Sequence, residues 1–157
     1  MSSLSAQVGG SHYKNLGYQP VELSHKLRLN GIQLLILKYL TRFRDKNGLE
    51  DLTKARHCCY LAYDLQEEPF YKLYMSIFEE AMPFIRKIRI KKFEKMIDEE
   101  CVTYCKLNKI YKPLTSIKLL CKGDWISCAK EIDKLIESYT DEQRRFGEKA
   151  QEPESTC

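Results

Sequence analysis

Residues Trp125–Tyr139 read WISCAKEIDKLIESY, and their apolar side chains recur at intervals of three and four. That spacing puts them on one face of an α-helix whose other face is polar. The same period recurs along the chain, whereas no segment alternates with the period of two that marks a strand. We therefore expect an all-α fold, a compact helical domain. The predicted helices are Val21–Leu29, Ile32–Arg44, Leu49–Gln66, Phe70–Met82, Phe84–Tyr104, Leu114–Cys121 and Trp125–Tyr139.

Glycine, asparagine and proline residues separate these predicted helices. Asn30-Gly31 and Asn47-Gly48 are expected to end the helices that precede them, because both residue types tolerate a left-handed conformation. Pro69 is expected to begin the fourth helix. From Gln143 onward the sequence has no apolar period. The predicted organisation is a flexible segment 1–10, a helical hairpin unit 11–66, a helical extension 67–142 packed on it, and a flexible tail 143–157.

Composition limits the class of protein. The 157 residues suit one domain, and an apolar fraction of 43% with 31% charged residues is typical of a globular chain. The seven cysteines follow no apolar leader, so we interpret them as reduced, buried thiols of a cytoplasmic protein. The longest apolar stretch, Ile32–Leu40, is too short to span a bilayer. A formal charge of +4 does not by itself indicate a nucleic-acid partner.

The common signatures of nucleotide chemistry and metal binding are missing from the sequence. It contains neither a glycine-rich phosphate loop ending in Lys-Ser or Lys-Thr nor a dinucleotide fingerprint or nucleophile elbow. Cys58-Cys59 and the pair Cys101 and Cys105 do not have the spacing of a structural zinc site. We therefore predict neither a P-loop kinase nor a metal site.

One group of residues carries candidate chemistry. Lys38, Arg42 and Lys46 follow one another at intervals of four, so three cations would line one side of a helix and contact phosphate. Tyr13 or Tyr39 would stack on a base. An alternative is that the cations of the helix pair with Asp45, Glu50 or Asp51 and brace the hairpin.

Two further roles rest on ionisable side chains. His12 is the candidate general acid or base, because histidine titrates near neutral pH. Glu22 and Asp51 would either orient a ribose hydroxyl or anchor the cations, and the spacing does not distinguish these roles.

The order of these residues resembles the SaV-like family of small phage proteins. The resemblance covers Ser11 to about Leu61 and departs from the family at Leu34-Leu35, where Gly-Asn is typical. It rests on His12-Tyr13-Lys14, Gln19-Pro20-Val21-Glu22, Leu37-Lys38-Tyr39-Leu40-Thr41-Arg42, Lys46, Glu50-Asp51-Leu52 and Lys54-Ala55.

One family member is a nucleotide kinase without the usual phosphate loop, so the resemblance implies a phage-encoded, nucleotide-binding protein. It implies a catalytic His12, with a nucleotide bound by Tyr13, Lys14, Lys38, Tyr39, Arg42 and Lys46, and with Gln19, Glu22, Asp51 and Lys54 in support.

The resulting function hypothesis is a deoxynucleoside monophosphate kinase-like phosphotransferase in the cytoplasm of an infected host. No cofactor is required by the sequence, although Mg²⁺ would accompany a nucleoside triphosphate. The first alternative is a non-catalytic protein that sequesters a nucleotide or cyclic nucleotide and counters host defence. The second alternative is a module that binds nucleic acid or a host protein. Its contact residues would be Arg86, Lys87, Arg89, Lys91, Lys92 and Lys95. The protein could form a homo-oligomer under any of these hypotheses.

Overall fold

The computed structural model describes residues 13, 15–76 and 83–149, without the side chains of residues 73–75, 83–86 and 147–149. The regular structure of these residues is helical. No strand occurs among these residues, so the predicted all-α class is confirmed. None of their helices is both long and apolar enough to cross a bilayer. The helices are α1 (Pro20–Leu27), α2 (Gly31–Arg42), α3 (Leu49–Asp64), α4 (Phe70–Ser76), α5 (Pro83–Asn108), α6 (Leu114–Lys122) and α7 (Trp125–Lys149).

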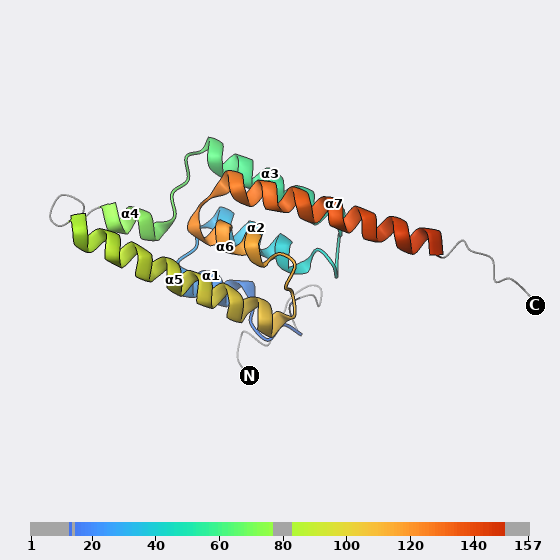
Figure 1. The fold of residues 1–157 in the computed structure, drawn as a ribbon, viewed down its shortest axis with the longest axis horizontal. Helices are drawn as coiled ribbons and strands as arrows, with labels where there is room; N and C mark the ends of the chain where they lie inside the picture. Colours follow the sequence, from blue (N-terminus) through green and yellow to red (C-terminus); the bar gives the residue numbers. More distant parts are fainter. Residues whose placement is uncertain (1–12, 14, 77–82, 150–157) are drawn as a thin grey trace, which may run out of the picture.

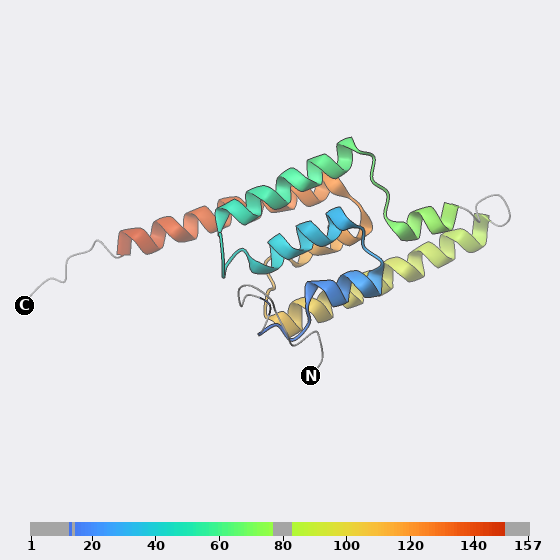
Figure 2. The same ribbon diagram turned by 180° about the vertical axis from the view of Figure 1, so that it is seen from behind.

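The helices are arranged in three layers. α1 lies beside α5, α2 beside α6, and α3 beside α7, as both views of the ribbon show (Figures 1 and 2). The chain passes through the layers in the same order twice, first as α1, α2 and α3 and later as α5, α6 and α7. The middle layer is therefore covered on both sides. α4 and the first half of α5 extend beyond the layers at one end, and the last part of α7 extends at the other (Figure 1).

The start of α2 corrects the interpretation of Asn30-Gly31. The Asn30 side chain accepts a hydrogen bond from the backbone N–H of Gln33 at 2.8 Å, and Gln33 Oε1 accepts one from the backbone N–H of Asn30 at 3.0 Å. This reciprocal capping box begins α2 instead of ending α1. α1 ends at Leu27, and the capping residue that follows it, Arg28, takes the left-handed conformation at φ 54°. The sequence prediction was wrong because asparagine suits both helix ends.

The ends of α2 and α7 also differ from the prediction. α2 ends at Arg42, and a turn follows in which Gly48 has a φ of +52°. α7 continues past Tyr139 to Lys149, through part of the predicted tail. The tail lacks an apolar period, but its charged and amide residues are good helix formers. Arg44 and Lys112 also bind Glu142 and tie the extended helix to the layers.

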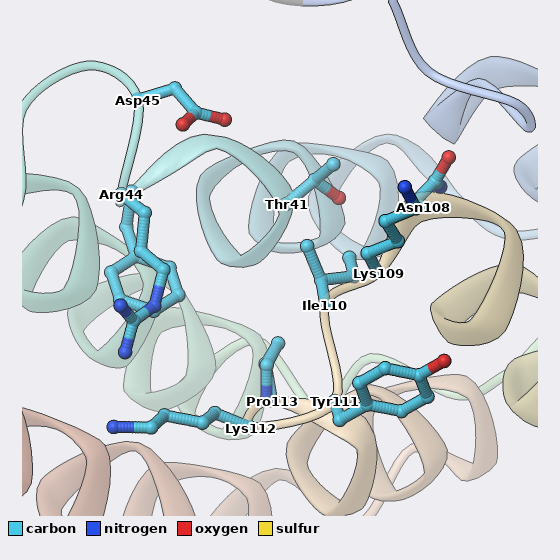
Figure 3. Close-up of a pocket in the computed structure, with 10 residues that line it drawn as sticks. Thr41, Arg44, Asp45, Asn108, Lys109, Ile110, Tyr111, Lys112 and Pro113 are labelled. Atoms are coloured by element: carbon cyan, nitrogen blue, oxygen red, sulfur yellow. The ribbon is translucent and has the colours of Figure 1, made fainter.

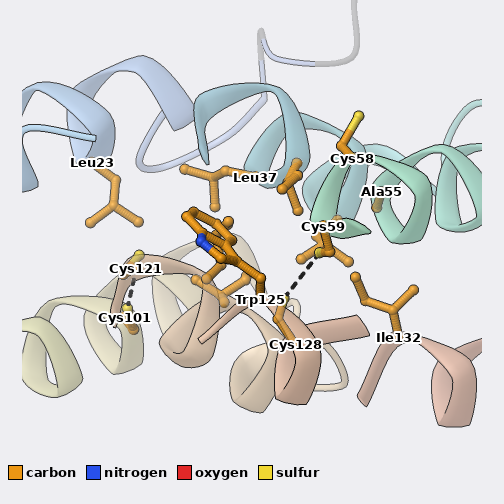
Figure 4. Packing of buried hydrophobic residues seen from close by; sticks show 14 of the residues in the cluster. Leu23, Leu37, Ala55, Cys58, Cys59, Cys101, Cys121, Trp125, Cys128 and Ile132 are labelled. Atoms are coloured by element: carbon orange, nitrogen blue, oxygen red, sulfur yellow. Dashed lines mark hydrogen bonds between the residues drawn. The ribbon is translucent and has the colours of Figure 1, made fainter. Parts of the chain in front are cut away.

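One core joins the predicted N-terminal unit to the predicted extension. Leu23 and Leu37 from the first part belong to the same buried cluster as Trp125 and Ile132 from the second (Figure 4). The Trp125 Nε1–H donates to the backbone carbonyl of Glu67 at 2.8 Å, which satisfies the polar atom of the ring. Neither part would bury its apolar face without the other.

Buried thiols are a second feature of this core. The six described cysteines are buried, as predicted, and none of them forms a disulfide. Cys59 Sγ lies 3.6 Å from Cys128 Sγ, and Cys101 Sγ lies 3.8 Å from Cys121 Sγ (Figure 4). Hydrogen bonding to these partners and burial raise the pKa of the Cys121 and Cys128 thiols. Burial raises the pKa of Cys105 to about 12.

These raised pKa values predict a loss of stability in alkali. Unfolded thiols ionise near pH 8.5, whereas the folded protein keeps Cys105, Cys121 and Cys128 protonated, so unfolding releases protons above that pH. The free energy of unfolding should fall by about 1.4 kcal/mol per pH unit for each such thiol. Urea titrations under reducing conditions from neutral to alkaline pH measure this slope. Cys105→Ala should make this slope shallower. A free energy of unfolding that does not change with pH in this range would contradict the raised pKa values of the thiols.

The corner between α6 and α7 requires a glycine. Gly123 ends α6 at φ +69°, where its backbone N–H bonds the carbonyls of Leu119 and Leu120. A Cβ at this position would lie 2.2 Å from Cγ of Pro69. Both the left-handed backbone and the close approach of the proline ring therefore exclude a side chain.

Gly123→Ala should lower the free energy of unfolding by about 2 kcal/mol or more, from backbone strain and overpacking together. Gly31→Ala is the matched control, because no atom lies within 4 Å of its added Cβ. That substitution should be neutral or stabilising by about 0.4–1 kcal/mol. Chemical denaturation of both variants measures the difference, and equal effects would contradict the steric explanation.

Candidate functional site

A small hollow lies where the N-terminal segment meets α1 and α2. Its volume is about 230 Å³, and its lining consists of Tyr13, Gln19, Pro20, Val21, Leu34 and Lys38. Three of these six, Tyr13, Gln19 and Lys38, are among the residues predicted to form the site. The other three are apolar, so the hollow has a polar and an apolar side.

Hydrogen bonds to the end of α5 fix the segment that leads into the hollow. Asn108 Oδ1 accepts from the backbone N–H of Tyr18 at 3.1 Å, and Asn108 Nδ2 donates to the Tyr18 carbonyl at 2.7 Å. The backbone N–H of Gln19 then donates to Glu22 Oε2 at 2.7 Å, which caps α1. Glu22 therefore has a local structural contact. α5, from the predicted extension, positions a segment of the predicted N-terminal unit.

Two cations of α2 lie against aromatic rings. Lys38 Nζ is 5.9 Å from the centroid of the Tyr13 ring, and the guanidinium of Arg42 is 5.1 Å from that of Tyr39. Both distances suit cation–π contacts. Burial raises the pKa of Tyr13, while the nearby Arg42 charge opposes the rise. None of the described carboxylates forms an ion pair with Lys38, so its charge is available to a ligand.

Arg42 is held by an ion pair between α2 and α3. Its Nε donates to Asp51 Oδ2 at 3.1 Å and its Nη2 to Asp51 Oδ1 at 3.3 Å. Asn47 Nδ2 also donates to Oδ1 at 3.3 Å. The Asp51 side chain is fully buried, which leaves it the role of anchor for a cation and not that of a contact to a ribose hydroxyl. The bracing of the hairpin by Arg42 and Asp51 was the alternative interpretation.

The remaining predicted site residues are distributed differently. Lys46 is exposed in the turn after α2, because that helix has already ended at Arg42. It therefore does not continue the line of Lys38 and Arg42. Lys54 is exposed on α3 and pairs with Glu50 four residues before it. His12 and Lys14 lie outside the described residues.

Breaking the Arg42–Asp51 pair should destabilise the protein. Arg42→Met would leave the buried carboxylate of Asp51 uncompensated, so we expect the free energy of unfolding to fall by about 3–5 kcal/mol. Combining Arg42→Met with Asp51→Leu should recover most of that loss, because no buried charge remains.

The control for this prediction is the solvent-exposed ion pair of Arg56 and Asp133. Arg56 Nη1 lies 2.7 Å from Asp133 Oδ1, and each side chain is 38% exposed. Arg56→Met should cost at most about 1 kcal/mol. Chemical denaturation of all variants measures these differences. Similar costs for the two arginines would show that burial of Asp51 does not set the strength of the pair.

A second hollow of about 400 Å³ lies between the end of α2 and the α5–α6 loop (Figure 3). The side chains of Arg44, Lys109, Lys112 and the exposed ring of Tyr111 line it. The sequence does not indicate this hollow, because its residues come from segments far apart in the chain. Arg44 and Lys112 both bind Glu142, so this carboxylate already offsets their charge. Burial and the neighbouring Arg44 lower the pKa of Lys112.

The described lining of the smaller hollow offers groups that can contact a ligand. Its described lining contains no carboxylate, imidazole or thiol that would act as an acid or base near neutral pH. Within the described ranges, no group of three or more histidine, cysteine, aspartate or glutamate side chains could hold a metal ion. The arrangement provides one unpaired cation, an aromatic ring and an apolar wall.

Comparison of the chain with models of known protein families, with curated proteins and with solved structures finds no match.

Proposed function

We propose that this protein binds a phosphorylated nucleotide in the hollow between the N-terminal segment and α2, with Lys38 contacting the phosphate. The observation that carries the proposal is the half-buried Lys38, which lies beside the hollow without a described carboxylate partner. A charge-assisted hydrogen bond from an ammonium group to phosphate is strong when it is partly shielded from water. Tyr13 supports the lysine through its ring face.

The size of the hollow suggests how a nucleotide would lie. A volume of about 230 Å³ is smaller than the roughly 300–1,000 Å³ of sites that enclose a small molecule. The phosphate and part of the sugar would therefore enter, while the base would stay at the rim. Val21 is 48% exposed at that rim and would contact one face of the base. Leu34 supplies the apolar wall in place of the Gly-Asn that is typical of the SaV-like family.

This binding site suits two forms of the function. The resemblance to the SaV-like family favours phosphoryl transfer to a deoxynucleotide in a phage-infected cell, with His12 as acid or base and Mg²⁺ bound to the donor triphosphate. The composition of the described lining favours binding without catalysis, as in a protein that sequesters a nucleotide or cyclic nucleotide. Both forms share the contact between Lys38 and phosphate.

Thermal unfolding with deoxynucleoside mono-, di- and triphosphates and cyclic dinucleotides tests the shared contact. A ligand at 100 times its dissociation constant should stabilise the protein by about 2.7 kcal/mol. Lys38→Gln should weaken binding by about tenfold or more, because it removes a hydrogen bond to a charged group. Lys106→Gln, an exposed lysine of α5 outside the hollow, should bind as the unchanged protein does.

Lys38 is a better residue to substitute than Arg42. Loss of Arg42 would also leave the buried carboxylate of Asp51 unpaired and destabilise the fold. No stabilisation by any nucleotide, or equal stabilisation of the two lysine variants, would contradict the proposal. His12→Ala then separates the two forms. An enzyme should lose phosphoryl transfer and keep binding, whereas a sequestering protein has no transfer to lose.

A further inference from the structure

A basic surface lies on the half of α5 that extends beyond the three layers (Figures 1 and 2). We call it the basic arm and define it by five exposed side chains of α5. Its backbone is supported from one side by α4, where the rings of Tyr71 and Phe93 stack at 5.0 Å with an interplanar angle of 21°. The five side chains are Lys87, Arg89, Lys91, Lys92 and Lys95.

The basic arm contains the entire charge excess of the protein. Residues 87–96 carry five basic side chains and one carboxylate, that of Glu94, so their net charge of +4 equals that of the whole chain. The other 147 residues hold 21 basic and 21 acidic side chains. A neutral body with one charged projection directs a polyanion to that projection.

The cations of the basic arm are largely unpaired. Lys95 Nζ lies 3.8 Å from Glu99 Oε1, but both side chains are more than 60% exposed, so water weakens this ion pair. None of the other four forms an ion pair with a residue that the structure describes. Solvated cations of this kind do not stabilise the fold. They are free to release counterions when they meet phosphate groups.

A groove of about 530 Å³ follows the basic arm. Its lining contains three cations, Arg89, Lys92 and Lys95, and the apolar side chains of Phe93 and Met96. One carboxylate, that of Glu99, also lines the groove, so its net charge remains positive. Phe93 is half-buried, and its ring stacks on that of Tyr71. Cations beside an apolar, aromatic floor are the features with which proteins bind single strands, where phosphates meet the charges and bases meet the ring.

We infer that the basic arm binds single-stranded nucleic acid, a function separate from the nucleotide hollow at Lys38. A duplex presents phosphates to the same cations but keeps its bases stacked inside, so the apolar floor would find no partner. An acidic protein segment would meet the charge without the regular spacing of phosphates. The apolar floor and the concentration of unpaired cations together favour the single strand.

The test is the affinity of the full chain for a fluorescent oligothymidine roughly 20 nucleotides long, measured by anisotropy at several salt concentrations. Three phosphate contacts, from Arg89, Lys92 and Lys95, would give a slope of about −2.1 in a plot of log affinity against log salt. Lys92→Gln combined with Lys95→Gln, which removes two cations of the groove, should make this slope shallower by about 1.4. The same change should weaken binding by more than about tenfold at 50 mM salt.

The matched control combines Lys106→Gln with Lys130→Gln, which removes two exposed lysines outside the basic arm. It lowers the net charge equally and should leave the slope unchanged. Equal slopes for the two double variants would overturn the assignment to the basic arm. Binding of a duplex of the same length as tightly as the single strand, or equal displacement by polyglutamate, would overturn the single-stranded ligand. Helical circular dichroism verifies that each variant is folded.

The same variants separate this inference from the proposed nucleotide site. Lys92→Gln with Lys95→Gln should leave the thermal shift with nucleotides unchanged, because neither residue lines the hollow at Lys38. Lys38→Gln should in turn leave the salt slope for oligothymidine unchanged. A loss of strand binding in Lys38→Gln would instead place the strand in the hollow and overturn the separate site.

Discussion

The ion pair of Arg42 and Asp51 is the constraint on which the site region depends. It joins the end of α2 to the beginning of α3 and thereby fixes the turn between them. Because the carboxylate is fully buried, the guanidinium cannot leave it for a ligand without a large cost in free energy. A residue that looks like a phosphate ligand therefore has a structural role. Its neighbour Lys38, one turn earlier on α2, keeps its charge available.

Polar atoms inside the helical layers specify how the helices meet. Gln33 is fully buried, and its Nε2 donates to the carbonyl of Leu120 at 2.9 Å, which aligns α2 with α6. Thr41 Oγ1 and the Tyr104 hydroxyl lie 2.7 Å apart in a second contact, between α2 and α5. Apolar packing alone tolerates several arrangements of helices, whereas a buried polar group must find its partner. These contacts favour one register of the middle layer.

The two proposed sites differ in how the fold treats positive charge. At the hollow, one lysine is shielded beside a tyrosine ring and faces a space the size of a phosphate and sugar. On the basic arm, five cations are solvated and spread along a helix. The first arrangement gives a strong local contact with a small ligand, and the second gives a salt-dependent attraction for a long polyanion. The neutral charge of the remaining chain keeps the two effects separate.

The sequence by itself determined the helical class and the approximate position of each helix, because apolar periodicity is a local property of the chain. It also indicated Tyr13, Gln19 and Lys38, which meet at one hollow. The tertiary structure decided that Asn30 begins a helix, that α7 continues to Lys149, and that Arg42 binds Asp51. It also created the hollow at Arg44 and Lys112. These features depend on contacts between residues distant in the sequence, or on whether a residue caps the start or the end of a helix. The spacing of residue types along the chain determines neither.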